Sequence, residues 1–86
     1  MTTFALPARL HRSDISPLCR EIGSGCGVVV VDVSAVTDPT VITIEALARL
    51  KLAARRHGRE LRVRGARPRL TELASLLGLE GVLMER

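Results

Sequence analysis

Aromatic side chains are almost absent from this sequence: Phe4 is the only one among 86 residues, and there is no tryptophan or tyrosine. Surfaces that bind single-stranded nucleic acid usually stack the bases on several aromatic rings. A platform of that kind is therefore not expected. The composition of 47% hydrophobic and 26% charged residues is otherwise that of a globular chain, and the length predicts a single domain over residues 1–86.

Long apolar runs are also missing. The longest run lies within residues 26–31, whereas a membrane-spanning helix needs about 20 apolar residues. The first residues, MTTFALP, lack the basic leader and apolar stretch of a secretory signal. We therefore expect no membrane span and no secretion, and the cytoplasm is the expected location.

Cysteine is scarce, with only Cys19 and Cys26. Two residues are too few for a disulfide framework, and neither lies in a cluster with metal-ligand spacing. We interpret both as reduced thiols that act as small apolar side chains. The sequence predicts no metal and no cofactor.

Positive charge is concentrated in the C-terminal half. Residues 1–43 carry three basic and four acidic side chains, whereas residues 44–86 carry ten and five, for a net charge of +4. A basic half of this kind can bind an acidic protein, a nucleic acid or a membrane surface, or it can be a solvated face without a partner. We favour the solvated face over nucleic acid. Seven of the basic residues cluster at Arg55, Arg56, Arg59, Arg62, Arg64, Arg67 and Arg69.

The first quarter of the chain predicts a strand and a helix. Residues 4–10 are a short extended candidate, in which Pro7 suits an edge strand because it cannot donate to a neighbouring strand. The helix that follows has Ser13 or Ser16 as its N-cap. Its apolar residues recur at helical spacing until the glycine-rich residues 23–25 end it.

A buried strand and the longest helix come next. Residues 27–33, GVVVVDV, are typical of a central strand that helices cover on both faces. The connection after the strand ends in Asp38, which resembles an N-cap, with Pro39 at the first helical position. Periodic apolar residues predict a helix over residues 40–57, and Gly58 supplies its stop.

The remaining elements complete an alternating pattern. Residues 60–64 alternate apolar and charged side chains and predict a strand. A third helix is predicted from residue 68 to about residue 77, with residues 82–84 as a last short strand or a turn of helix. The order of elements predicts an α/β fold: a small, mostly parallel sheet of three to four strands packed with three helices.

Catalytic constellations are not found. Residues 23–27, GSGCG, follow a helix and precede a strand, the reverse of a phosphate-binding loop, so we interpret them as a turn. A nucleophilic triad needs His11 or His57, which we interpret as solvated. The alternatives for Asp32 are a contact to a ligand and a cap on the following loop, and we favour the cap. We expect no enzyme activity.

Four stretches of the sequence resemble one known domain family in their order and spacing. They are VVVVDVSAVTD, EALARLKLAARRHGREL, LRVRG and ARPRLTELASLLGLEGVL, which together cover roughly two-thirds of the chain, about residues 28–83. The family is the STAS domain, which anti-sigma factor antagonists, sulfate-transporter tails and small lipid-transport accessory proteins share. The resemblance implies a STAS-like fold and a regulatory role through protein–protein interaction.

The sequence departs from the STAS pattern in two places. A family member usually opens with two strands in a hairpin, whereas this chain has room for one before Ser13. Antagonists also carry Asp-Ser-Ser-Gly at the start of the long helix, and the first of these serines is phosphorylated. An ungapped alignment places that serine at Val41, which cannot accept phosphate. The phosphorylation switch is expected to be lost, and the remaining candidate phosphoacceptors are Thr40 and Thr43.

The long helix carries a second apolar stripe away from its core stripe. Val41, Ala48 and Leu52 share this face, and charged residues stand beside them. A small apolar patch rimmed by charge is typical of a weak protein-binding surface; the alternative is that a neighbouring element shields it. In STAS proteins this helix and the loop before it form the docking face. The predicted partner-binding residues are Asp38, Thr40, Val41, Glu45, Ala48, Arg49, Leu52 and Arg56.

The resemblance also suggests the kind of partner. It implies an anti-sigma or kinase-like regulator, or a transporter component. One alternative is a homodimer built from a sheet edge near Leu6 or from the same helix face. A less favoured alternative is an anionic polymer bound by the cluster from Arg55 to Arg69.

Overall fold

A parallel sheet of three strands forms the centre of the structure, a computed structural model that describes residues 2–78. The strands are β1 (Thr2–Ala5), β2 (Val29–Asp32) and β3 (Leu61–Arg64). Their order is β1-β2-β3, so β2 pairs in parallel with both neighbours. The predicted parallel sheet is therefore confirmed, with three strands within the described residues.

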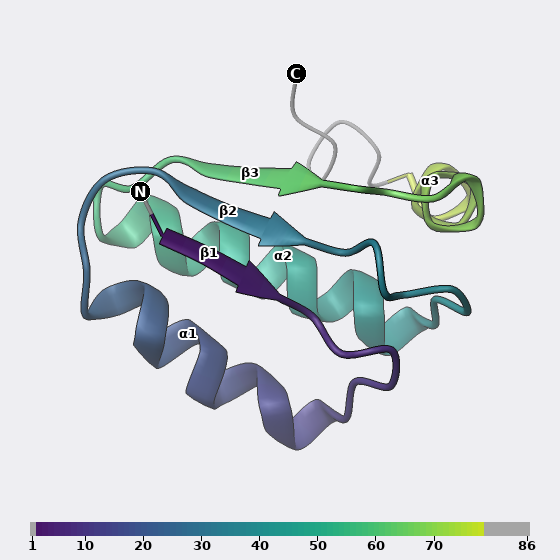
Figure 1. Cartoon of the computed structure of the whole chain (residues 1–86), viewed down its shortest axis with the longest axis horizontal. Coiled ribbons are helices and arrows are strands. Elements are labelled where there is room, and N and C mark those ends of the chain that lie inside the picture. The colour runs from purple at the N-terminus through teal and green to yellow at the C-terminus, as the bar shows by residue number, and fades with distance from the viewer. Residues whose placement is uncertain (1, 79–86) are drawn as a thin grey trace.

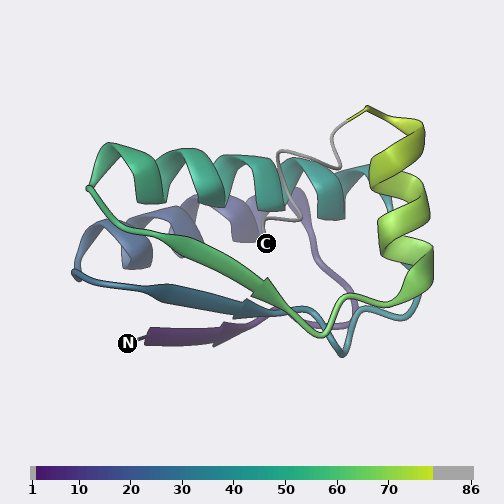
Figure 2. The same ribbon diagram turned by 90° about the horizontal axis from the view of Figure 1, so that it is seen from above.

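The helices follow the strands in alternation. They are the 3-10 helix η1 (Arg12–Asp14) and the α-helices α1 (Ile15–Gly23), α2 (Val41–Arg56) and α3 (Pro68–Leu76). Figures 1 and 2 show α1 and α2 side by side on one face of the sheet. Helix α3 crosses the end of the molecule toward which the strands point. The predicted three helices are confirmed.

Both large helices lie on the same side of the sheet, which corrects the expectation that helices cover β2 on both faces. Val29 and Val31 point into the helical layer and are fully buried. Val30 points to the opposite face and is still buried. The register places Thr3 and Arg62 on either side of it, so neighbouring strands shield Val30 within the sheet.

The first strand begins earlier than predicted, and the first helix is entered differently. Strand β1 ends at Ala5, so Pro7 lies outside it. Neither Ser13 nor Ser16 is the N-cap of α1: the chain enters through η1, where the Asp14 carboxylate accepts a hydrogen bond of 2.9 Å from the backbone N–H of His11. This local bond stabilises the short turn from Arg12, and α1 itself begins at Ile15, between the two predicted starts.

Helix α2 begins two residues later than the Asp38–Pro39 signal predicted. Thr40 is its N-cap, in an extended conformation, and its backbone N–H donates to Thr43 Oγ1 at 3.2 Å. The hydroxyl of Thr43 therefore satisfies an N–H that has no partner within the helix. The later elements agree with the predicted β3 and α3 to within about a residue, and the predicted element at residues 82–84 lies outside the described residues.

The core fills the space between the sheet and the two helices. Helix α2 contributes Ile44, Leu47, Leu50 and Ala54, the stripe predicted from periodicity. Burial of this stripe fixes the rotation of α2 about its axis and so determines which side chains face outward.

Candidate protein interface on helix α2

The outward face of α2 carries two exposed apolar side chains. Val41 is 60% exposed and Leu52 is 49% exposed, while Ala48 between them is half-buried against the core. Neighbouring elements therefore do not shield the patch that Val41 and Leu52 form.

Glu45 organises the charged rim of this patch. Its carboxylate pairs with Arg12 of η1 at 3.1 Å and with Arg49, one turn further along α2, at 3.7 Å. The first pair connects η1 to α2, and the second spans one helical turn. All three side chains keep substantial exposure, so each pair contributes little stability on its own. Together they fix where charge stands beside the apolar residues.

The predicted residues before α2 lie at the end of the sheet where the strands finish. Asp38 and Thr40 line a hollow of about 500 Å³ between residues 8–11 and residues 37–43. The Asp38 carboxylate also lies 3.7 Å from the Arg69 guanidinium of α3, in an exposed ion pair. Arg56 stands at the opposite end of α2, so the predicted set extends along the whole helix.

The two candidate phosphoacceptors differ in accessibility. Thr43 is only 4% exposed and its hydroxyl already accepts the Thr40 N–H. Thr40 is exposed at the helix N-cap. A modifying enzyme can therefore reach Thr40 more easily, and its phosphorylation remains a prediction.

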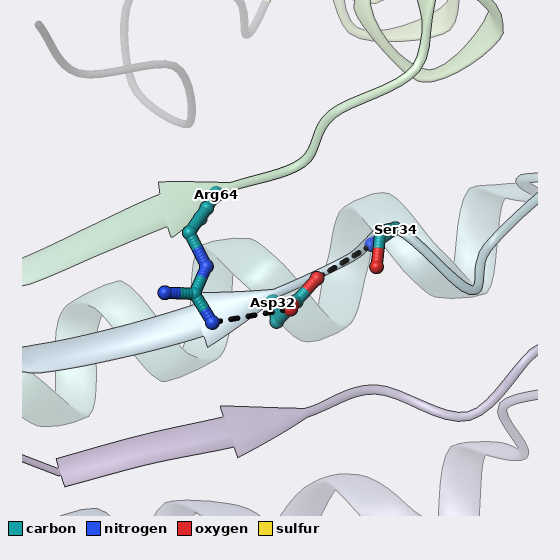
Figure 3. A network of polar contacts seen from close by, with 3 residues as sticks. All are labelled: Asp32, Ser34 and Arg64. Atoms are coloured by element: carbon teal, nitrogen blue, oxygen red, sulfur yellow. Dashed lines mark hydrogen bonds and ion pairs between the residues drawn. The ribbon is translucent and has the colours of Figure 1, made fainter.

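Asp32 acts as a cap on the loop that follows β2, as favoured from the sequence. Its carboxylate accepts a hydrogen bond of 2.9 Å from the Ser34 backbone N–H and pairs with Arg64 of β3 at 3.2 Å, as Figure 3 shows. The hydrogen bonds from Ser34, and then the Arg64 contacts, lower the pKa of Asp32 below its ordinary value. The group is thus a stable carboxylate that fastens β3 to the loop.

The arginine cluster does not form one continuous basic face. Arg62 pairs with Glu60, and Arg64 and Arg69 pair with Asp32 and Asp38. Ion pairs thus offset part of the charge that the sequence suggested for a polymer-binding surface.

Arg59 is buried, which sequence reasoning did not foresee. Only 4% of the residue is exposed, and its guanidinium donates to the carbonyls of Ile22, Cys26 and Gly27 and to Thr2 Oγ1. It joins the start of β1, the end of α1 and the loop before β2. The only sequence signal was its place just after Gly58 and the helix stop, where the chain turns back toward the sheet.

The described residues show no further reactive centre. Residues 2–78 contain no cluster of histidine, cysteine or acidic side chains that could hold a metal ion. No helix in that range is long and apolar enough to cross a membrane. His11 and His57 lie at different elements, both exposed.

Comparison with known proteins decides the family. A family model described as Mlab, STAS domain, matches residues 9–85. The chain belongs to the STAS domain family. Its parallel sheet and three helices are consistent with the STAS fold, and STAS domains are generally binding modules that interact with protein partners. No curated protein and no solved structure matches the chain.

Proposed function

We propose that this STAS domain is a non-enzymatic module that docks on a regulatory protein through residues 38–43 and the outward face of α2. The observation that carries the proposal is the exposure of Val41 and Leu52 on a helix whose other side is fully committed to the core. Burying such side chains against a partner is favourable by about 1.5–3 kcal/mol each. The charged side chains of Glu45 and Arg49 beside the patch would determine the orientation in which a partner binds.

The partner class follows from the family. An anti-sigma or kinase-like regulator fits best, and a transporter component is the alternative. Because the ungapped alignment puts Val41 at the position of the phosphorylated serine, we propose that the usual switch is lost and that binding does not depend on phosphorylation. Intact-mass analysis of protein isolated from its native cells checks this: an unmodified mass agrees, and a mass increase of one phosphate contradicts it.

The proposal is tested by placing charge on the apolar patch. Val41→Glu and Leu52→Glu, separately and together, should abolish co-purification with the partner, because a carboxylate cannot be desolvated there without a counter-charge. Leu77→Glu is the matched control, since Leu77 is a leucine like Leu52, is 44% exposed at the C-cap of α3, and does not line the hollow beside Asp38. Circular dichroism should remain unchanged in all variants. A complex that survives both α2 substitutions contradicts the proposal.

A second candidate function, self-association, rests on the free edge of β1. This strand is uncharged, and Thr3 and Ala5 are exposed along it. Edge strands without charge or proline are liable to pair with a strand of another chain. Light scattering over a wide concentration range distinguishes the two functions, since a strict monomer eliminates the homodimer and leaves the docking proposal intact.

A further inference from the structure

A second, open hollow lies between the C-terminal ends of α1 and α2, and Arg56 is the one residue of the predicted interface that lines it. It measures about 550 Å³ and lies on the side of the molecule opposite α3. Ala53 and Cys19 line its walls, together with Arg20 from α1 and Arg56 and His57 from the end of α2. Basic side chains thus surround a space that no acidic side chain lines.

The two arginines at this hollow lack carboxylate partners, unlike five other arginines of the described chain. Arg12 and Arg49 share Glu45, and Arg64 pairs with Asp32. By contrast, no carboxylate among residues 2–78 forms an ion pair with Arg20 or Arg56. Helix C-termini carry about half a negative charge each, which offsets part of this charge but does not supply a carboxylate.

The histidine is held in place by close packing. A methyl group added at Gly23 would come within 2.8 Å of His57 Nε2, so the imidazole lies directly on the backbone of α1. Because Gly23 has no side chain, the exposed ring of His57 can lie this close to α1 at the edge of the hollow. The hollow is a shaped feature of the α1–α2 junction and not only a group of mobile arginines.

The hollow lies beside one end of the apolar patch. Leu52 and Arg56 are four residues apart on α2 and therefore lie on one face, one turn from each other. A partner that covers Leu52 can therefore also reach Arg56 at the edge of the hollow. Uncompensated cations next to a buried contact favour a partner with a negative group at that place.

We infer that the protein partner presents an aspartate or glutamate side chain that enters the hollow between Arg20 and Arg56, next to an apolar side chain that packs on Leu52. The inference rests on the proposed docking function and specifies the chemistry of its partner. Two guanidinium groups can each donate hydrogen bonds to one carboxylate, and Ala53 and Cys19 keep water away from one side of it. The occupant is an acidic segment of a protein.

The test uses two synthetic peptides that differ at two positions only. In one peptide a leucine is followed by two glutamates, and in the other it is followed by two glutamines. Titration into the ¹⁵N-labelled full chain, followed by amide chemical shifts, should show saturable changes at Arg20, Ser24, Leu52 and His57 with the glutamate peptide. The glutamine peptide should bind at least about fivefold more weakly, because the charge-assisted hydrogen bonds are lost.

Paired variants isolate the role of the hollow. Arg20→Gln with Arg56→Gln should remove the difference between the peptides, whereas Arg62→Gln with Arg69→Gln removes the same charge from exposed positions elsewhere and should retain it. Equal binding of both peptides, shifts at other residues, or no saturable change up to about 5 mM overturns the inference. If the substitutions at Val41 and Leu52 still abolish co-purification in that case, only the carboxylate assignment fails; if they do not, the docking function fails as well.

Discussion

Arg59 shows how one side chain can join segments that are far apart in the sequence. It reaches the Ile22 carbonyl at 2.7 Å and the Gly27 carbonyl at 3.0 Å, 37 and 32 residues away. Both carbonyls lie where a helix has ended or a strand has not begun, and the Ile22 carbonyl additionally accepts a longer bond of 3.5 Å from the Gly25 N–H. The charge of Arg59 is therefore used within the fold and is not available to a partner.

Replacing Arg59 should be strongly destabilising. Arg59→Met keeps much of the aliphatic volume but leaves the three carbonyls without their donor, so we expect a loss of about 2–4 kcal/mol in the free energy of unfolding. Arg55→Met, at an exposed position of the same charge, should change it by less than about 1 kcal/mol. Urea unfolding followed by circular dichroism measures both, and similar losses in the two variants contradict this role of Arg59.

Asp32 makes stability depend on pH. Hydrogen bonds from Ser34, with the Arg64 contacts, lower the pKa of Asp32 in the folded state, so the unfolded chain takes up this proton first as the pH falls. Its contribution is complete above the unfolded pKa of about 4 and is lost as the pH falls below that value and through the lower folded pKa.

The variant Asp32→Asn isolates this effect. It should be less stable than the natural protein near neutral pH, and the difference in free energy of unfolding should shrink as the pH falls through the acidic range. Urea titrations at several pH values give the two curves. Parallel curves throughout this range contradict the assignment.

At the scale of elements, the start of α2 illustrates a competition between two helix signals. Asp38–Pro39 matches the preferred residues of an N-cap and first position, yet the helix uses Thr40 and Thr43. Burial decides between the two, because a later start leaves Thr43 inside and Val41 outside while Ile44 points at the core. Asp38 and Thr40 differ as N-caps by less free energy than burial of one large apolar side chain such as Ile44 provides, so burial determines where the helix starts.

Substitutions at the two possible caps should distinguish them. Thr40→Ala is expected to cost about 0.5–2 kcal/mol in the free energy of unfolding, as for other N-cap positions. Asp38→Ala removes only an exposed ion pair with Arg69 and should cost less than about 0.5 kcal/mol. A larger effect of Asp38→Ala in thermal or urea unfolding contradicts the observed helix start.

For the whole molecule, the distribution of charge argues against polymer binding. The sequence places seven arginines within fifteen residues, but the fold buries Arg59 and pairs Arg62, Arg64 and Arg69 with carboxylates. A phosphate backbone needs several free cations in a row and, for single strands, aromatic rings to stack on. Between Arg55 and Arg69, the described surface offers neither a row of free cations nor an aromatic ring.

Nucleic-acid binding should accordingly be weak. We expect no change in the fluorescence anisotropy of a labelled single-stranded DNA of about 20 nucleotides at about 150 mM salt and up to about 10 µM protein. Proteins that bind DNA non-specifically have dissociation constants of about 1–100 µM, so the titration covers part of that range. The peptide titrations provide the positive control for folded, active protein. Saturable binding under these conditions contradicts the argument that burial and ion pairs leave the arginine cluster too few free cations to bind nucleic acid.

The fold followed from the sequence to a large extent because its signals are local. The valine run that forms β2, the periodic stripe of α2 and the Leu61–Arg64 alternation each specify an element without reference to the rest of the chain. Helical geometry likewise placed Val41 and Leu52 away from the core stripe of α2, whereas only the structure showed that no neighbouring described element shields them.

The sequence by itself thus determined the kind and order of the elements and the outward side of α2, because period and glycine stops act over a few residues. Only the tertiary structure decided that both helices share one face of the sheet, that Arg59 is internal and that Arg20 meets Arg56 and His57 around a hollow. These features depend on segments more than thirty residues apart, such as Ile22 and Arg59. Their proximity arises only when burial of the core brings the segments together, so no pattern within a short window records it.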